Sequence, residues 1–254
     1  MKQFILLTIL FMLLNTAIAC SSGNPIVHKT YQFEGAEASI LVFTKTDGWR
    51  HDSIEVGVEA VVELGRKNSF NVTWTENSEY FTDENLAAYD AVVFLNTTLT
   101  VFSYRERTVF KTYIQNGGGF VGVHSATDTE YDWPWYGELV GAYFDNHPPG
   151  VHEAIIEVVD HNHPSTQHLD EQWVKVDEWY NFGYLNENVN VLLKLDTDSF
   201  EGSDHPGNHP IAWYHEFDGG RAFYTGLGHT KESFTEPLFL DHLLGGIQYA
   251  MGHL

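Results

Sequence analysis

Two histidines of this sequence follow apolar segments, and they are the residues best placed to do chemistry. His124 comes directly after Phe-Val-Gly-Val, and His229 comes four residues after Ala-Phe-Tyr-Thr. An imidazole has an unperturbed pKa of about 6.5, so it can act as an acid, a base or a metal ligand. Most of the other histidines, from a total of 14, stand in polar or terminal segments, although His51 and His209 are further candidates. We therefore expect His124 and His229 to be functional.

Carboxylates and aromatic side chains accompany these histidines. Asp128 stands four residues after His124, and Glu178 precedes Trp179. Either carboxylate could orient an imidazole or activate a water molecule. Aromatic faces beside polar groups suit the C–H faces and hydroxyls of a sugar, but they suit a packed hydrophobic seam equally well. The candidate catalytic residues are His124, His229, Asp128 and Glu178, and the candidate substrate-binding residues are His51, Trp133, Trp135, Tyr136, Trp179 and His209.

A parallel sheet would bring these distant residues together. Apolar strands are expected at 39–44, 70–75, 90–96 and 120–123, with a helix beginning near residue 54 and another over 103–115. This alternation of strands and helices is typical of a doubly wound parallel sheet. Ligands of such sheets bind beyond the carboxyl ends of the strands. His51, His124 and His229 all follow expected strands, so we expect them at one edge of the sheet.

The second half of the chain has a different pattern. After a short helix over 133–141, strands are expected at 151–159, 172–180, 189–196, 210–217 and 221–226, without long helices between them. This favours an antiparallel extension of the parallel core. An amphipathic helix over 237–251 closes the chain. The fold class that we expect is α/β, with a parallel-sheet core and an antiparallel β extension in the C-terminal half.

The composition excludes several classes of protein. The chain has 254 residues, with 13 Lys+Arg against 35 Asp+Glu, which gives a formal net charge of −22. A field this negative repels phosphate backbones, so we expect no nucleic-acid partner. Cys20 is the single cysteine, and one cysteine can form neither an internal disulfide nor a CxxC metal site.

The N-terminus resembles a secretory signal that ends at Cys20. Lys2 and an uncharged apolar run precede Ala17-Ile-Ala, which is a small-residue cleavage pattern. The predicted organisation is a signal peptide at 1–19, a lipoprotein tether at 20–36 and a folded domain at 37–254. Cys20 at the first mature position resembles the bacterial lipoprotein signal, although Ala17 stands where leucine is usual. We expect an exported protein in the periplasm or outer membrane, held by a lipid on Cys20, with plain secretion as the alternative.

Three segments carry a family resemblance. The segments 118–141, with His-Ser-Ala-Thr-Asp at 124–128, 177–182, with Asp-Glu-Trp-Tyr-Asn-Phe, and 220–233, with Gly-Leu-Gly-His-Thr at 226–230, resemble the ThuA-like (trehalose utilisation) family. The resemblance covers nearly all of residues 38–251. It implies a flavodoxin-like core of the class I glutamine amidotransferase-like superfamily. It also implies a link to the metabolism of sugars, especially disaccharides.

The resemblance also implies a changed nucleophile. Amidotransferases carry Gly-aliphatic-Cys at a strand-to-helix elbow, and Gly122-Val-His124 matches that pattern with imidazole in place of the thiol. Their later histidine and glutamate resemble His229 and Glu232. Glutamine hydrolysis needs a thiolate, so glutaminase activity is excluded. Ser125, with His229 as its base, is a less favoured substitute because it stands one residue beyond the elbow position.

Three functions stay open at this point. In the first, His124 and His229 act as acid and base in the hydrolysis or isomerisation of a keto-sugar or glycoside, with Asp128 or Glu178 in support. In the second, His124, His229 and a third group hold a divalent metal, which is the one cofactor that we consider. In the third, the protein is a lipid-anchored receptor that binds a carbohydrate without changing it. The partner is a small-molecule carbohydrate in each case, and the convergence of polar groups favours an enzyme.

Overall fold

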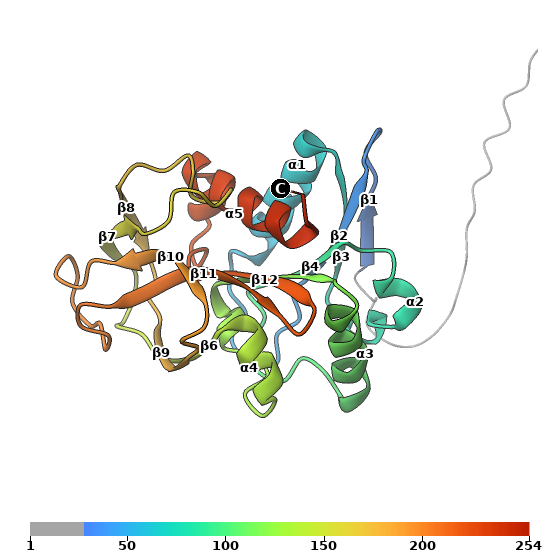
Figure 1. The fold of residues 1–254 in the computed structure, drawn as a ribbon, viewed down its shortest axis with the longest axis horizontal. Helices are drawn as coiled ribbons and strands as arrows, with labels where there is room; N and C mark the ends of the chain where they lie inside the picture. The colour runs from blue at the N-terminus through green and yellow to red at the C-terminus, as the bar shows by residue number, and fades with distance from the viewer. Residues whose placement is uncertain (1–27, 254) are drawn as a thin grey trace, which may run out of the picture.

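The computed structural model describes residues 28–253, through which a ten-stranded mixed sheet runs (Figure 1). Five neighbouring strands are parallel, in the order β3-β2-β4-β5-β12. Their bounds are Ala38–Phe43 (β2), Phe70–Thr75 (β3), Ala91–Leu95 (β4), Gly119–Val123 (β5) and Gly220–Thr225 (β12). This is the 2-1-3-4-5 order of flavodoxin-like sheets, and it confirms the predicted fold class.

Helices cover both faces of the parallel strands, as Figure 1 shows. One face carries α1 (Ile54–Asn68) and α5 (Pro237–Met251), and the other carries α2 (Asp83–Leu86), α3 (Tyr104–Gln115) and α4 (Pro134–Val140). Short 3-10 helices lie at Ser78–Tyr80, His124–Thr127 and Ser233–Thr235. Several helices begin where the sequence signals predict. Ser103 and Glu106 form a capping box before α3, and proline opens both α4 and α5.

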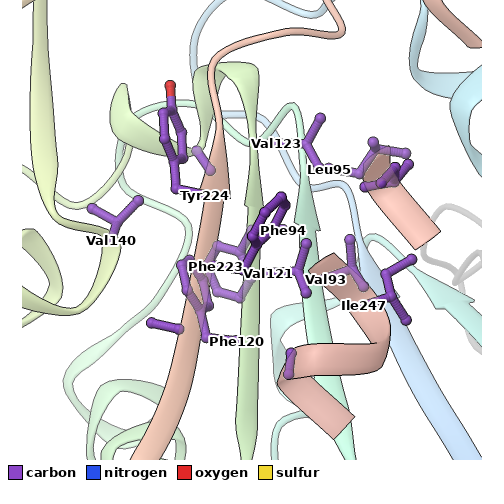
Figure 2. Packing of buried hydrophobic residues seen from close by; sticks show 14 of the residues in the cluster. Val93, Phe94, Leu95, Phe120, Val121, Val123, Val140, Phe223, Tyr224 and Ile247 are labelled. Carbon is purple, nitrogen blue, oxygen red and sulfur yellow. The ribbon is translucent and has the colours of Figure 1, made fainter. Parts of the chain in front are cut away.

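The core is packed on both sides of the central strands, which explains their unbroken apolar runs. On one side, Phe94 of β4 stacks on Phe110 of α3, with ring centroids 5.2 Å apart. On the other side, Phe223 of β12 lies 5.4 Å from the ring of His242 in α5. Figure 2 shows side chains of β4, β5 and β12 in one cluster with Ile247 of α5. A sheet buried on both faces holds its strand ends, and therefore the site, in fixed positions.

The antiparallel extension predicted for the C-terminal half is present. From β12 the sheet continues through antiparallel strands in the order β11-β10-β7-β8. These strands are β11 (His209–Phe217), β10 (Asn190–Leu195), β7 (His152–Val158) and β8 (Gln172–Asp177). A separate pair, β6 (Ala142–Asn146) and β9 (Asn181–Leu185), was not expected from the sequence. Its strands are short and irregularly paired, so neither gives a clear alternating pattern.

The N-terminal boundary needs a correction. Residues 28–31, which the sequence assigns to the tether, form the edge strand β1 (His28–Tyr31), paired antiparallel with β3. Lys29 and Thr30 of this edge strand are exposed and Tyr31 is half-buried, so the strand lacks the apolar run that marks the buried strands. The predicted signal peptide and Cys20 lie outside the described residues. Within 28–253, no helix has both the length and the apolar character needed to cross a membrane.

Candidate functional site

Three histidines meet at the carboxyl edge of the parallel sheet, as predicted. His51 lies beyond β2, His124 directly follows β5 and His229 follows β12. Their ring centroids lie 4.9 to 5.1 Å apart, and the rings are steeply inclined to one another. Glu178 joins them from the end of β8, in the antiparallel extension. We call His51, His124, His229 and Glu178 the histidine cluster.

His124 is held at a tight backbone turn. Its φ is +48°, a left-handed conformation that is uncommon outside glycine. The ring is fully buried, and Nδ1 lies 2.9 Å from the carbonyl oxygen of Gly226. Because a carbonyl can only accept, Nδ1 carries a proton and donates it. Nε2 is therefore the ring nitrogen that faces the rest of the cluster.

A buried carboxylate positions His229. Asp177 is fully buried and accepts hydrogen bonds from the backbone N–H groups of Gly228 and His229, at 2.9 and 3.1 Å. It also accepts one from the hydroxyl of Ser233, at 3.0 Å. Gly228 has a φ of +107°, which side-chain-bearing residues rarely adopt. The loop after β12 is thus tied to the end of β8, which brings His229 and Glu178 together.

Both oxygens of Glu178 are engaged. Its Oε2 lies 3.3 Å from Nε2 of His124 and 3.0 Å from Nδ1 of His229. Its Oε1 lies 3.2 Å from Nδ1 of His147. Burial raises the pKa of this carboxyl, but hydrogen bonds from His124 and His229 outweigh burial and hold the pKa well below its usual range. For His229 burial lowers the pKa and Glu178 raises it, with a net increase.

His51 is a neutral imidazole. Burial, followed by the nearby rings of His124 and His229, lowers its pKa to about 2. Its Nδ1 lies 3.4 Å from the hydroxyl of Ser125, which is fully buried. The histidine beside Ser125 is therefore His51 and not His229, which removes the geometric basis for Ser125 with His229 as its base.

A cavity of about 430 Å³ opens beside the cluster. It is lined by Trp49, His51, Asp128, Phe144, His147, Glu178, Tyr180 and His229. Asp128 accepts a hydrogen bond of 2.7 Å from the hydroxyl of Tyr131 at Oδ1. Burial raises the pKa of Asp128, and the Tyr131 hydrogen bond opposes that increase only in part. The pocket therefore contains two carboxylates in opposite environments.

The cluster also has the composition of a metal site. His51, His124, His229 and Glu178 each offer one ligand atom, and these atoms all lie within 4.8 Å of one another. Imidazole nitrogens and a carboxylate oxygen are ligands of zinc and of related transition metals. The sequence shows no pair of metal ligands at helical spacing because each ligand comes from a different strand end.

Five predicted substrate-binding residues do not line this cavity, and their part in binding stays a prediction. Trp179 is fully buried and donates from Nε1 to the carbonyl of His152. His209 is also buried, with Nε2 bonded to the carbonyl of Tyr180. Tyr136 is fully buried in the core. Trp133 and Trp135 stack on each other, with centroids 4.9 Å apart, and carry Arg107 and Lys111 over their rings near α3.

Other residues of the site were not selected from the sequence for a role in binding. Trp49 follows the first expected strand, which places it at the same sheet edge, and it is the tryptophan that lines the cavity, with a largely exposed side chain, at 73%. His147 contacts Glu178, although its position before two prolines indicated only a loop or a lid. Asp177 is the last residue of the alternating strand β8, so apart from its place in the family-like segment 177–182 the sequence gives it no sign of a role. Their roles depend on contacts between segments far apart in the chain.

Comparison with known proteins gives a consistent result. A family model described as ThuA, trehalose utilisation, matches residues 39–250. No curated protein matches the chain. A solved structure described as a ThuA-like protein of Bacteroides uniformis is 22% identical, with a TM-score of 0.71, over 90% of this chain and 95% of that one. A second, from Parabacteroides merdae, is 20% identical, with a TM-score of 0.67, over 84% and 90%.

A larger enzyme contains a similar fold. The β-galactosidase from Bacillus circulans is 12% identical, with a TM-score of 0.55, over 85% of this chain and 31% of that one. At this identity the likeness concerns the fold alone. The family match therefore carries more weight than any of the structural neighbours.

Proposed function

The chain belongs to the ThuA family, which is linked to trehalose utilisation, and on that premise we propose that it is an enzyme acting on a sugar derivative in the cavity beside the histidine cluster. The substrate class is a keto-sugar or glycoside, and the reaction is a hydrolysis or isomerisation that depends on proton transfer. The cavity of about 430 Å³ has room for such a molecule.

One observation carries this proposal: the two carboxylates of the pocket have different hydrogen-bond partners and pKa values that are shifted in opposite directions. Glu178 is bonded at both oxygens and kept ionised. Asp128 is bonded at Oδ1 only, and burial raises its pKa. Among residues 28–253, no protein group is bonded to its Oδ2. Carboxylates whose pKa values are pushed apart in one pocket take different roles in catalysis. Asp128 is therefore the group that gives or takes the proton.

The histidine cluster stabilises the charge that develops on the substrate. A proton transfer to Asp128 leaves negative charge on a substrate oxygen, and preorganised positive groups nearby lower the energy of that state. His229, whose pKa is raised by Glu178, stands at the cavity wall. Phe144, Tyr180 and Trp49 supply aromatic faces for the C–H face of a sugar ring.

A product screen with matched variants tests the proposal. Trehalose, related glycosides and their keto forms are incubated with the full chain, and products are followed by NMR. We expect turnover of at least one sugar, and Asp128→Asn should reduce kcat by about 100-fold or more. His168→Gln, outside the pocket, is the matched control. Wild-type activity in Asp128→Asn would overturn the proposal. Sugar binding without any turnover would also overturn it and would favour a carbohydrate receptor.

Export is a separate part of the proposal and rests on the sequence of residues 1–20. We propose that the chain is exported and that Cys20 carries a lipid anchor. Labelling with a fatty-acid analogue should mark the native chain, and Cys20→Ala should be unlabelled and released from membranes. Labelling that persists in Cys20→Ala would contradict the anchor, and an unlabelled native chain in the medium would support plain secretion.

A further inference from the structure

Ligand atoms of the histidine cluster converge at short distances. Nδ1 of His124 donates to the carbonyl of Gly226, so Nε2 is the ring nitrogen that faces the cluster. Nε2 lies 3.3 Å from Oε2 of Glu178, and the imidazole is fully buried. A buried imidazole nitrogen and a carboxylate oxygen at this distance need a cation between them, either a proton or a metal ion.

The distances match those around a metal ion. Nε2 of His124, Nδ1 of His229 and Oε2 of Glu178 form a triangle with edges of 3.3, 3.0 and 3.2 Å. A tetrahedral ion with ligands at about 2.0–2.1 Å separates those ligands by roughly 3.3 Å. An ion bound by all three atoms would lie roughly 1 Å from their plane, at ordinary bond lengths.

The surroundings of the triangle resemble the support that metal ligands usually have. Gly226 fixes the ring of His124 through its other nitrogen, and His147 occupies the second oxygen of Glu178. Such partners orient the ligand atoms and keep the carboxylate monodentate. A ring nitrogen of His51 lies within 4.8 Å of the three atoms, which makes it a fourth ligand or a close neighbour. The cavity borders the cluster, so one coordination position faces the substrate.

We infer that the histidine cluster is a mononuclear centre for a divalent transition metal, with His124, His229 and Glu178 as ligands and His51 as the fourth candidate. Nitrogen-rich sites favour zinc, copper, iron or nickel over magnesium, calcium and manganese, which suit oxygen ligands. The ion would polarise an oxygen of the substrate while Asp128 transfers the proton. This catalytic part rests on the proposed function, whereas metal binding itself does not.

Metal titration of the full chain tests the inference. Protein made without a histidine tag is stripped with EDTA, dialysed and titrated with Zn²⁺ and Co²⁺ by calorimetry. We expect one ion per chain, and the visible spectrum of bound Co²⁺ should report nitrogen and oxygen ligands. Glu178→Gln and His229→Gln should weaken binding by more than about 100-fold, and His147→Ala by about tenfold.

Two controls keep the result specific. Asp128→Asn changes the same pocket without removing a proposed ligand, so its metal affinity should stay within about twofold of the wild type. His168→Gln removes a histidine outside the cluster and should also bind normally. Circular dichroism of each stripped variant shows whether it is folded. Absence of stoichiometric binding, or unchanged binding in folded Glu178→Gln and His229→Gln, would overturn the metal centre.

The two proposals fail in distinguishable ways. A stripped protein that binds no metal but turns over a sugar, with loss in Asp128→Asn, would refute the metal centre and leave the enzyme. A protein that binds one ion at the cluster but changes no sugar would refute the enzyme and leave the metal centre.

Discussion

Two sets of buried histidines in this protein differ in what their ring nitrogens contact. His209 and His242, which we call the packing histidines, have both ring nitrogens bonded to ordinary partners. His242 contacts the carbonyl of Ser165 at 2.9 Å and the hydroxyl of Thr225 at 3.1 Å. In the histidine cluster, His124 is just as buried, but its second nitrogen faces another imidazole and a carboxylate. Burial therefore does not separate a functional histidine from a structural one, whereas the partner of the second nitrogen does.

This difference has an energetic consequence. A buried imidazole with hydrogen-bond partners at both nitrogens costs little free energy and helps to define the packing. Several imidazoles and a carboxylate buried together cost free energy unless a ligand or an ion binds between them. The packing histidines should therefore contribute to stability, and the cluster should contribute to function. Substitutions in the two regions can test that division directly.

Of the substitutions considered, loss of His124 should produce the largest effect, and this effect should be on turnover. His124→Asn removes the imidazole but keeps a residue that tolerates a positive φ, so the backbone turn is retained. We expect kcat to fall by about 1000-fold because the charge-stabilising cluster is broken. Steady-state kinetics on the sugar found in the product screen measures this. Retention of more than a tenth of the activity would place His124 with the packing histidines.

Loss of His242 should give the opposite pattern. His242→Gln leaves a fully buried site with at least one of two partners, Ser165 and Thr225, unsatisfied. We expect the free energy of unfolding to fall by about 2 kcal/mol, with kcat per folded molecule unchanged. Urea unfolding and kinetics on the same preparation measure both. Unchanged stability with impaired turnover would contradict the comparison.

The packing histidines should also make stability depend on pH. Burial is the main cause that lowers the pKa of His242 to about 3 and that of His209 to about 4. In the unfolded chain both titrate near about 6.5, so the unfolded state binds more protons as the pH falls below that value. Each histidine should then cost about 1.4 kcal/mol between pH 7.5 and 5.5, of which about 1.0 kcal/mol falls between pH 6.5 and 5.5, and almost nothing above pH 7.5.

His242→Gln isolates this pH contribution. Urea unfolding at pH 7.5 and 5.5 measures the free energy of unfolding of the variant and of the wild type. All titratable groups other than His242 are the same in the two proteins. The variant should lose about 1.4 kcal/mol less than the wild type over this interval. An equal loss in both proteins would show that His242 is not held neutral by the fold.

Much of the fold follows from patterns that are local in the sequence. Buried parallel strands give continuous apolar runs, as in Ala91–Leu95, and the capping box of Ser103 and Glu106 predicts the start of helix α3. Edge strands give no continuous apolar run, because polar residues are tolerated where one side of the strand is uncovered. This is why β1 (His28–Tyr31) falls within the predicted tether.

The position of the site could be predicted because the fold brings the carboxyl ends of the parallel strands together. His124 and His229 were selected because each follows a buried strand, and the structure brings them within 3.2 Å of each other through Nε2 and Nδ1. Their roles stay a prediction. Asp177 and His147 could not be selected, because their importance comes from contacts with a distant loop and with Glu178. The predicted tryptophans do not line the cavity, because aromatic composition does not distinguish a ring in the core from one in a cavity, and their part in substrate binding stays a prediction.

The tryptophans give the smallest effect and the last test of the comparison. Trp49 lines the cavity with an exposed ring, whereas Trp135 is held among Phe110, Phe217 and Trp133. An aromatic contact is worth about 1 kcal/mol, so Trp49→Ala should raise KM by roughly fivefold and change kcat little. Trp135→Phe is the matched control and should leave KM unchanged. A rise in KM for Trp135→Phe alone would show that sugars bind at the stacked pair near α3, and it would move the substrate site away from the histidine cluster.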